Sequence, residues 1–234
     1  YSDFGTGGNL QNVDRELRSV FVADPGWKFG NVDLEQGDAR NVGAILWNLY
    51  TPQFGEKFGG AYLDACESGD LHTFVCRMSR PDLPWTGDLA ADKKIAEQIA
   101  YRQDSYRQLA KKLGHGTNYY GTPRTMAKHT KVPTHVIEEF QVNYFRAFPA
   151  IGSVDRKDVS TPHWHNYVRG QLRDTHTLTT LFGRRRQFFG RSFDDSTLRE
   201  AIAYEPQSMT ADEIDGALLR LWRWGKVQLL IQVH

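Results

Sequence analysis

The pattern of apolar and polar positions predicts strands near both ends of the chain and helices between them. Residues 17–34 place apolar positions on either side of a Pro-Gly turn, which indicates two strands, the second ending at Asp33. Residues 227–234 have the apolar content of a buried strand. Residues 175–189, with Gly183 at the bend, predict a hairpin.

Between these strands the spacing of apolar residues is helical. Predicted helices cover 36–49, a short segment that opens at Asp70, 92–118, 134–147, 150–172 and 194–224, and the Pro-, Gly- and Asp-rich stretch 81–92 predicts a loop. Strands at both ends with a helical insertion between them favour an α+β domain that carries a helical subdomain.

The amino-acid composition limits the class of protein to which the chain can belong. The 234 residues are 40% hydrophobic without a long apolar run, which suits a soluble globular protein of one or two domains that spans no membrane. No signal-like segment opens the chain, so we expect a cytoplasmic location. Cys66 and Cys76 are too few for a disulfide framework and are expected to be reduced. Because the chain opens on Tyr1 and closes on His234 within an apolar run, we expect both ends to be cut.

Charge is distributed unevenly along the chain although the net charge is only +1. Residues 1–100 hold 9 Lys and Arg against 15 Asp and Glu, whereas 101–131 hold 7 against Asp104 alone. Contact with a polyanion would therefore centre on 101–131. A solvated helix face explains the same charges.

Four residues within 101–131 are spaced by four: Arg107, Lys111, His115 and Tyr119. Each step of four drifts by only about 40° around a helix, so these side chains form one stripe. Two cations followed by aromatic rings could hold a triphosphate and stack on its base. The alternative is a helix with solvated cations above a buried aromatic end.

A second candidate is Asp33, with Gln36, Asp38 and Arg40 just after it. A carboxylate at the end of a strand suits Mg²⁺, which is commonly bound by one or two carboxylates together with substrate phosphates. An ordinary N-cap or turn role is the alternative.

Seven segments, in this order and nearly with this spacing, resemble motifs of the family A (DNA polymerase I-like) DNA polymerases. They are 9–12 with Arg18 and Phe21, 32–40 (motif A), 70–73, 107–121 (motif B), 180–186, 206–212 and 229–234 (motif C). The resemblance spans the whole chain and implies a polymerase palm, an antiparallel sheet with helices, that carries an α-helical fingers subdomain. It implies that 1–40 is the N-terminal part of the palm, 41–150 mainly fingers, and 151–234 the C-terminal part of the palm.

The resemblance also implies an activity and its residues. It implies a monomeric DNA-templated DNA polymerase of DNA replication in a bacterial or phage-infected cell. This enzyme would transfer a dNTP to a primer 3′-hydroxyl with two Mg²⁺ ions on primer-template DNA. Implied catalytic residues are Asp33, Lys111 and Arg107, and the implied metal ligands are Asp33 and the backbone carbonyl of Leu34. Implied dNTP-binding residues are Gln36, Asp38, His72, Arg107, Lys111, His115 and Tyr119, and implied DNA-binding residues are Arg18, Arg184, Gln207 and His234.

Several positions depart from the family pattern. Asp38 stands where the family usually has Glu, so we expect weaker exclusion of ribonucleotides, and His115 replaces Phe or Tyr. One extra residue makes Tyr119 and Tyr120 rivals for the template-side aromatic position, and the spacing of four favours Tyr119. The family's second catalytic Asp would follow His234, so we expect the fragment alone to be inactive.

Two other functions fit part of the pattern. A single-subunit phage-type RNA polymerase has a similar palm and fingers helix, but Asp38 and the segment 9–12 favour DNA synthesis. A catalytically inactive nucleic-acid-binding module is the other alternative, and the intact Asp33, Arg107 and Lys111 disfavour it.

Overall fold

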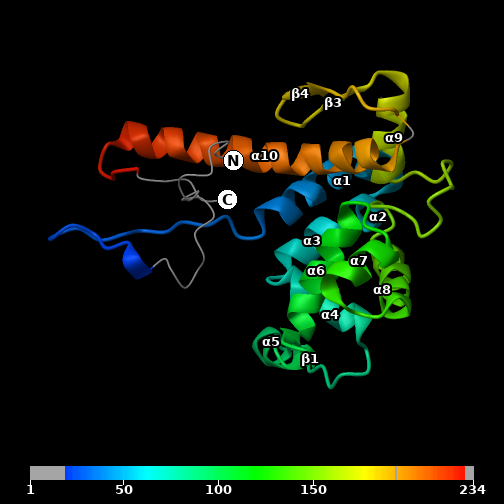
Figure 1. The fold of residues 1–234 in the computed structure, drawn as a ribbon, viewed down its shortest axis with the longest axis horizontal. Coiled ribbons are helices and arrows are strands. Elements are labelled where there is room, and N and C mark those ends of the chain that lie inside the picture. The colour runs from blue at the N-terminus through cyan, green and yellow to red at the C-terminus, as the bar shows by residue number, and fades with distance from the viewer. Residues whose placement is uncertain (1–18, 193, 230–234) are drawn as a thin grey trace. The chain divides into compact units, whose positions relative to one another are not determined.

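The computed structural model describes residues 19–192 and 194–229, which form two compact units. Residues 36–212 make up the larger unit, and the smaller one contains the described residues 19–35 and 213–229. The elements are helices and two small antiparallel sheets, in agreement with the predicted α+β class (Figure 1). The assignment of residue ranges to palm and fingers stays a prediction.

The larger unit begins with three helices that pack on one another: α1 (Gly37–Phe54), α2 (Glu56–Gly59) and α3 (Ala61–Glu67). Helix α1 confirms the predicted helix and extends it to Phe54. Its buried residues Val42, Ile45 and Leu46 follow the spacing of one helix face. At Gly59 a Cβ atom would lie 2.5 Å from the backbone nitrogen of Thr51, so only glycine allows α2 this close to α1.

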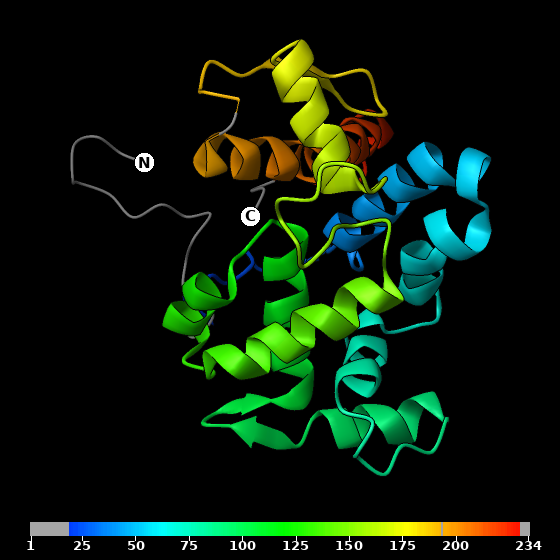
Figure 2. The same cartoon turned by 90° about the vertical axis from the view of Figure 1, so that its right-hand side faces the viewer.

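The centre of this unit is built from four helices: α4 (Leu71–Ser79), α6 (Tyr106–Asn118), α7 (Pro123–Thr130) and α8 (Thr134–Ala147). Figure 2 shows α8 running diagonally across α6, and α4 packs against both. The helix predicted over 134–147 is confirmed.

A buried aromatic cluster joins these helices to α3. The Tyr144 hydroxyl donates to Asn118 Oδ1 at 2.9 Å, and Asn118 Nδ2 donates to the Tyr62 hydroxyl at 2.8 Å. The ring of Phe148 meets the rings of Tyr62 and Tyr144 edge-on at 4.9 and 5.1 Å. These contacts fix the C-terminal end of α6 in the core because each buried polar atom has a partner.

The predicted helix 92–118 is wrong in its middle. Helix α5 (Leu89–Ala96) ends early, and a hairpin of β1 (Ile99–Tyr101) and β2 (Asp104–Ser105) precedes α6. Arg102 turns this hairpin with a φ of 55°. Ser105 then starts α6 with a capping box, in which its hydroxyl accepts from Gln108 N and the Gln108 side chain accepts from Ser105 N.

The second hairpin confirms the sequence prediction. Strand β3 (Thr177–Thr179) pairs antiparallel with β4 (Arg185–Gln187), and Gly183 lies in the connecting turn with a φ of 86°. That backbone conformation is one that glycine adopts without strain.

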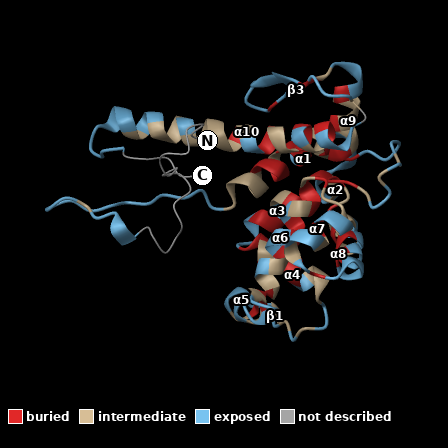
Figure 3. Ribbon diagram, viewed as in Figure 1, coloured by how far each residue is buried: buried red, intermediate tan, exposed pale blue. Residues whose placement is uncertain are grey.

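Helices α9 (Trp164–Asp174) and α10 (Asp195–Trp224) complete the larger unit, and α10 continues into the smaller one. The predicted helix 194–224 is confirmed. The predicted helix 150–172 is wrong over 151–163, where Asp158 accepts hydrogen bonds from Ser160 and Thr161 and so holds a turn. The buried residues of α10 lie in its first half, as Figure 3 shows.

The smaller unit departs from its prediction. Residues 19–35 contain no strand, and Val20, Val22 and Val32 are exposed there, so the predicted pair of strands is wrong for these residues. Residues 227–229 are not in a strand either. Most of the strand predicted at the end of the chain, residues 230–234, lies outside the described residues.

Two further findings concern the described part of the chain. None of its helices has both the length and the apolar character needed to cross a membrane. Cys66 and Cys76 are free thiols in the core, as expected, and burial raises the pKa of each to about 12, which makes them unreactive.

Candidate nucleotide-binding site

Three segments of the larger unit bring the predicted dNTP-binding residues together. Gln36 and Asp38 open α1, His72 lies in the first turn of α4, and the stripe of cationic and aromatic residues follows α6. The side-chain oxygen of Gln36 accepts from the backbone nitrogen of Leu71 at 3.2 Å, which ties the start of α1 to the start of α4.

At the N-terminal end of α6, Arg107 is bound to a buried carboxylate. Its Nε and Nη2 donate to the two oxygens of Asp70 at 2.7 and 2.9 Å, and Thr73 donates to the same carboxylate. Asp70 stands at the N-cap position of α4 but makes no side-chain capping bond. Burial raises the pKa of Asp70, but the hydrogen bonds from Arg107 and Thr73 and the charge of Arg107 outweigh it, so the net pKa is lowered.

His72 lies beside this ion pair and is electrically neutral at neutral pH. Burial, followed by the charge of Arg107, lowers its pKa to about 4, and Lys111 and His115 act in the same direction. A neutral imidazole offers one N–H donor and one acceptor, so His72 can still donate a hydrogen bond to an anion.

Lys111 is the exposed cation in the middle of the stripe. Within residues 19–192 and 194–229 it forms no ion pair, whereas the neighbouring Lys112 donates to both oxygens of Asp104 at 2.8 and 2.7 Å. Consecutive helical residues point about 100° apart, so the two lysines serve different faces of α6. Lys111 therefore keeps its ammonium group available to a ligand.

At the C-terminal end of α6, a cluster of side chains surrounds Asp38. The Tyr119 hydroxyl donates to Asp38 Oδ1, and His115 Nδ1 lies 3.5 Å from Asp38 Oδ2. The His115 and Tyr119 rings meet edge-on at 4.6 Å. Burial and then the Asp38 charge raise the pKa of Tyr119 well above its usual value, so the phenol stays a donor.

Tyr119 and Tyr120 point to different surroundings. Tyr119 accompanies Asp38 and His115, whereas Tyr120 is buried with its hydroxyl bonded to Arg169 Nη2 at 2.9 Å. The preference for Tyr119 over Tyr120 as the template-side aromatic residue stays a prediction.

The remaining candidates are dispersed. Asp33 and Leu34 are exposed residues of the smaller unit, while Gln207 is exposed on α10 in the larger one. Arg184 follows Gly183 in the hairpin turn, and its Nε donates to Asp212 Oδ1 at 3.0 Å. Arg18 and His234 lie outside the described residues.

The described residues contain no group of three or more His, Cys, Asp and Glu side chains that could enclose a metal ion. Asp33 nevertheless suits a hard cation, because its carboxylate is exposed and is paired with no cation in the described part of the chain. One carboxylate completed by substrate phosphates and water is a normal Mg²⁺ environment. The donor set therefore fits substrate-bound Mg²⁺ better than a metal held by protein alone.

Sequence reasoning missed the partner of Arg107. The signal was present, because Asp70 stands two residues before His72 in the segment that resembles the family motif. Asp is also a common N-cap residue, so the local sequence favours a capping role over a contact across 37 positions in the sequence.

Comparison with known proteins points to one class, the DNA polymerases. No protein-family model matches the chain. It is 26% identical to the DNA polymerase I of Aquifex aeolicus over 90% of its length, and 27% identical to that of Chloroflexus aurantiacus over 97%. The chain covers 31% and 22% of these two relatives. The resemblance to the family A DNA polymerases is thereby confirmed.

Proposed function

We propose that this chain forms the nucleotide-binding core of a DNA-templated DNA polymerase that acts in DNA replication. The observation that carries the proposal is the grouping of Asp38, His72, Lys111, His115 and Tyr119 on α1, α4 and α6. Side chains 81 positions apart in the sequence meet here, and they are the types that a nucleoside triphosphate requires.

The triphosphate would lie along the first half of the stripe. Lys111 stands one turn from Arg107, a rise of about 6 Å along the helix axis. Two of the five N–H groups of Arg107 are bonded to Asp70, which leaves three for phosphate oxygens. In the proposed reaction the primer 3′-oxygen forms a bond to the α-phosphorus and the bond to pyrophosphate breaks. Lys111 and Arg107 would stabilise the charge that develops on the leaving pyrophosphate.

The base and sugar would lie along the second half. The His115 side chain is 58% exposed and offers a ring face for stacking, while Asp38 is 31% exposed and held by the Tyr119 hydroxyl. A carboxylate fixed at this place would face the sugar and disfavour a 2′-hydroxyl. Gln36 would support this arrangement through its bond to Leu71.

Asp33 and the carbonyl of Leu34 would hold the Mg²⁺ ions. When bound, Mg²⁺ would neutralise phosphate charge and orient the triphosphate. Two residues separate Asp33 from Gln36, so the three Cα-to-Cα steps between them limit their Cα atoms to a distance of about 11 Å.

Primer-template DNA would be the second partner. Gln207 is exposed on α10 and could contact a DNA strand. Arg184 would have to break its hydrogen bond to Asp212 before it could bind a DNA phosphate. Arg18 and His234 would add contacts. A single chain with its DNA would suffice, without a second copy.

The test is equilibrium dNTP binding and primer extension with the complete protein that contains this chain. Lys111→Ala should weaken dNTP binding about tenfold to a hundredfold, because a contact to a charged phosphate is lost. Lys112→Ala is the matched control and should change the affinity less than about twofold, since Lys112 is engaged with Asp104.

The proposal would be wrong if both lysine variants weakened binding equally, or if the wild type extended no primer. Asp33→Asn adds a second arm. It should abolish synthesis while DNA binding persists, because it removes a metal ligand but no phosphate-binding cation.

A further inference from the structure

The end of α6 is held in an unusual way. Tyr120 adopts a left-handed conformation with a φ of 60°, its backbone nitrogen donates to Thr117 O, and Gly121 N donates to Gly116 O at 2.8 Å. These are the two bonds of a Schellman motif, in which the left-handed residue is usually glycine. A tyrosine at this place is strained, so other contacts must hold it there.

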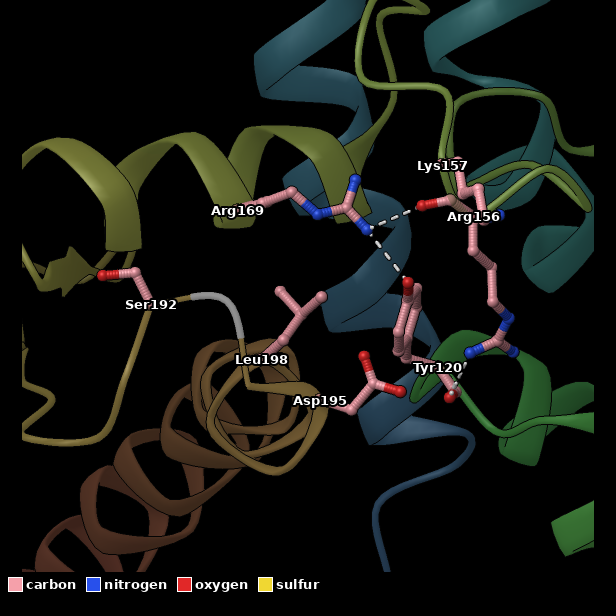
Figure 4. A pocket seen from close by; sticks show the side chains of 7 residues that line it. All are labelled: Tyr120, Arg156, Lys157, Arg169, Ser192, Asp195 and Leu198. Carbon is pink, nitrogen blue, oxygen red and sulfur yellow. Dashed lines mark hydrogen bonds between the residues drawn. The ribbon is translucent and has the colours of Figure 1, made fainter.

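Two arginines supply those contacts. Arg156 donates from Nη1 to Tyr120 O at 3.1 Å and from Nη2 to Gly121 O at 2.6 Å, and its guanidinium carbon lies 4.1 Å from the centre of the Tyr120 ring. Arg169 donates to the Tyr120 hydroxyl and to Arg156 O at 3.2 Å. Figure 4 shows Arg169 reaching from α9 towards both groups, with Arg156 close to Tyr120.

Tyr120 and its two arginine partners make more contacts than the end of α6 requires. A glycine at position 120 would end α6 without strain. Here the tyrosine ring packs under Arg156 and edge-on to His165 at 5.3 Å. Burial lowers the pKa of Arg156, although its partners Tyr120 and Asp195 act in the opposite direction. Arg156 donates to two carbonyls, but its half-buried charge is partly removed from water, which costs free energy. An ordinary helix end does not need such a group.

The residue next to this held turn is Tyr119. Tyr119 is the last residue before the left-handed turn and carries the hydroxyl that bonds to Asp38. If the turn at Tyr120 relaxes, the Tyr119 side chain loses its fixed direction, and Asp38 and His115 lose a common neighbour.

We propose that Arg156 is a positioning residue of the nucleotide site, acting through Tyr120 on the Tyr119–Asp38 bond. This inference rests on the proposed function, since it concerns the same site. Arg156 touches neither the stripe nor a substrate. It sets the direction of Tyr119 from the opposite side of the helix end.

A cavity beside the cluster makes a sharp experiment possible. It has a volume of about 280 Å³ and is lined by Tyr120, Arg156, Lys157, Arg169, Ser192, Asp195 and Leu198 (Figure 4). Truncation of Arg156 would enlarge this space, so a small guanidinium ion from solution could enter and replace the lost group.

The first arm of the test needs no activity. In the complete protein, Arg156→Ala should accelerate amide hydrogen exchange of Tyr120 and Gly121 at least tenfold, while the amides in the middle of α8 keep their protection. Methylguanidinium should restore slow exchange, and Arg156→Lys should restore it in part because it keeps the charge without the planar fork. Arg173→Ala, which removes an exposed arginine on α9 bonded to Asp174, is the control and should change nothing.

The second arm is kinetic. Arg156→Ala should raise the KM for dNTP about tenfold with less than a threefold change in kcat, and methylguanidinium should reverse the change. Unchanged exchange at Tyr120 and Gly121 would overturn the proposal whatever the kinetics. Faster exchange with an unchanged KM would also overturn it, and would reduce Arg156 to a structural role. If the wild type shows no synthesis, the proposed function fails, and the exchange arm reports on the turn independently.

Discussion

The two ends of α6 hold a carboxylate in different ways. Asp70, at the N-terminal end, has a side chain 7% exposed and bonded to Arg107 and Thr73, whereas Asp38, at the C-terminal end, is 31% exposed and bonded to Tyr119. The first cluster is closed and includes a full cationic partner. The second is open and its partners are a phenol and an imidazole. The difference indicates that the Asp70 cluster holds α4 and α6 together, while the Asp38 cluster keeps a carboxylate available to a ligand.

The largest effect is expected from breaking the closed cluster. Asp70→Asn leaves the mostly buried Arg107 without its anion and should lower the free energy of unfolding by about 3 kcal/mol. Chemical denaturation measures this change. Asp82→Asn, which removes the carboxylate of the exposed pair with Arg80, is the control and should have little effect.

A double-mutant cycle sharpens this prediction. Because Arg107→Met removes the cation left behind by Asp70→Asn, the two changes together should cost less than the sum of the single changes. A strictly additive result would contradict the view that Asp70 and Arg107 form one closed unit.

A second effect, of similar or smaller size, comes from a buried carboxylate that forms no ion pair within the described residues. Glu205 on α10 accepts from Trp164 Nε1 at 3.0 Å, and burial, partly offset by this bond, raises its pKa from 4.5 to about 7. A raised pKa means that the contribution to stability is present below about pH 4.5 and is lost as the pH rises through 7. The loss should amount to about 3 kcal/mol at most.

The side chain of glutamine cannot ionise, so Glu205→Gln should remove the loss of stability between pH 4.5 and 7. Unfolding measured between pH 4.5 and 8 should show a flatter profile than the wild type, whereas Glu200→Gln, at an exposed position of the same helix, should keep the wild-type slope. An unchanged slope in Glu205→Gln would show that Glu205 is ionised in the core. Asp70 should behave in the opposite way, since its lowered pKa makes its contribution disappear as the pH falls.

The smallest effect concerns the open cluster. Asp38→Glu lengthens the acid by one methylene and should bring the carboxylate closer to the sugar of a bound nucleotide. We expect the preference for dNTP over the matching ribonucleotide to rise about fivefold, which corresponds to about 1 kcal/mol. Single-nucleotide incorporation by the complete protein measures this ratio.

The control for Asp38→Glu makes the same chemical change elsewhere. Asp64→Glu alters an exposed acid on α3 that hydrogen-bonds none of the site residues and should leave the preference unchanged. An equal ratio in wild type and Asp38→Glu would contradict a role for Asp38 at the sugar.

Local patterns predicted most helices of the larger unit. Helices α8 and α10 begin and end within one residue of their predicted bounds, because their apolar residues keep one helical spacing and breakers flank them. The hairpin around Gly183 was predicted for the same reason. The β1–β2 hairpin was not, although Ser105 and Gln108 form a capping box visible in the sequence. The helix predicted over 92–118 runs past this capping box, because the helical spacing of Arg107, Lys111, His115 and Tyr119 does not mark where the helix begins.

Contacts between distant segments were harder to predict. The stripe on α6 was visible from spacing alone, but its partners Asp70 and Asp38 come from other helices and depend on packing. The strand pattern of 17–34 failed over the described residues because a strand is stabilised mainly by a neighbouring strand. No described strand pairs with 19–35.

The most direct test of the account is a crystal structure of the complete protein with primer-template DNA, a terminated primer, the matching dNTP and Mg²⁺. If Lys111 binds the triphosphate, the account predicts that triphosphate oxygens lie within about 3 Å of Lys111 Nζ in this structure. It also predicts a Mg²⁺ ion about 2.1 Å from a carboxylate oxygen of Asp33. A nucleotide bound away from α6, or Asp33 out of reach of its metal, would contradict the account.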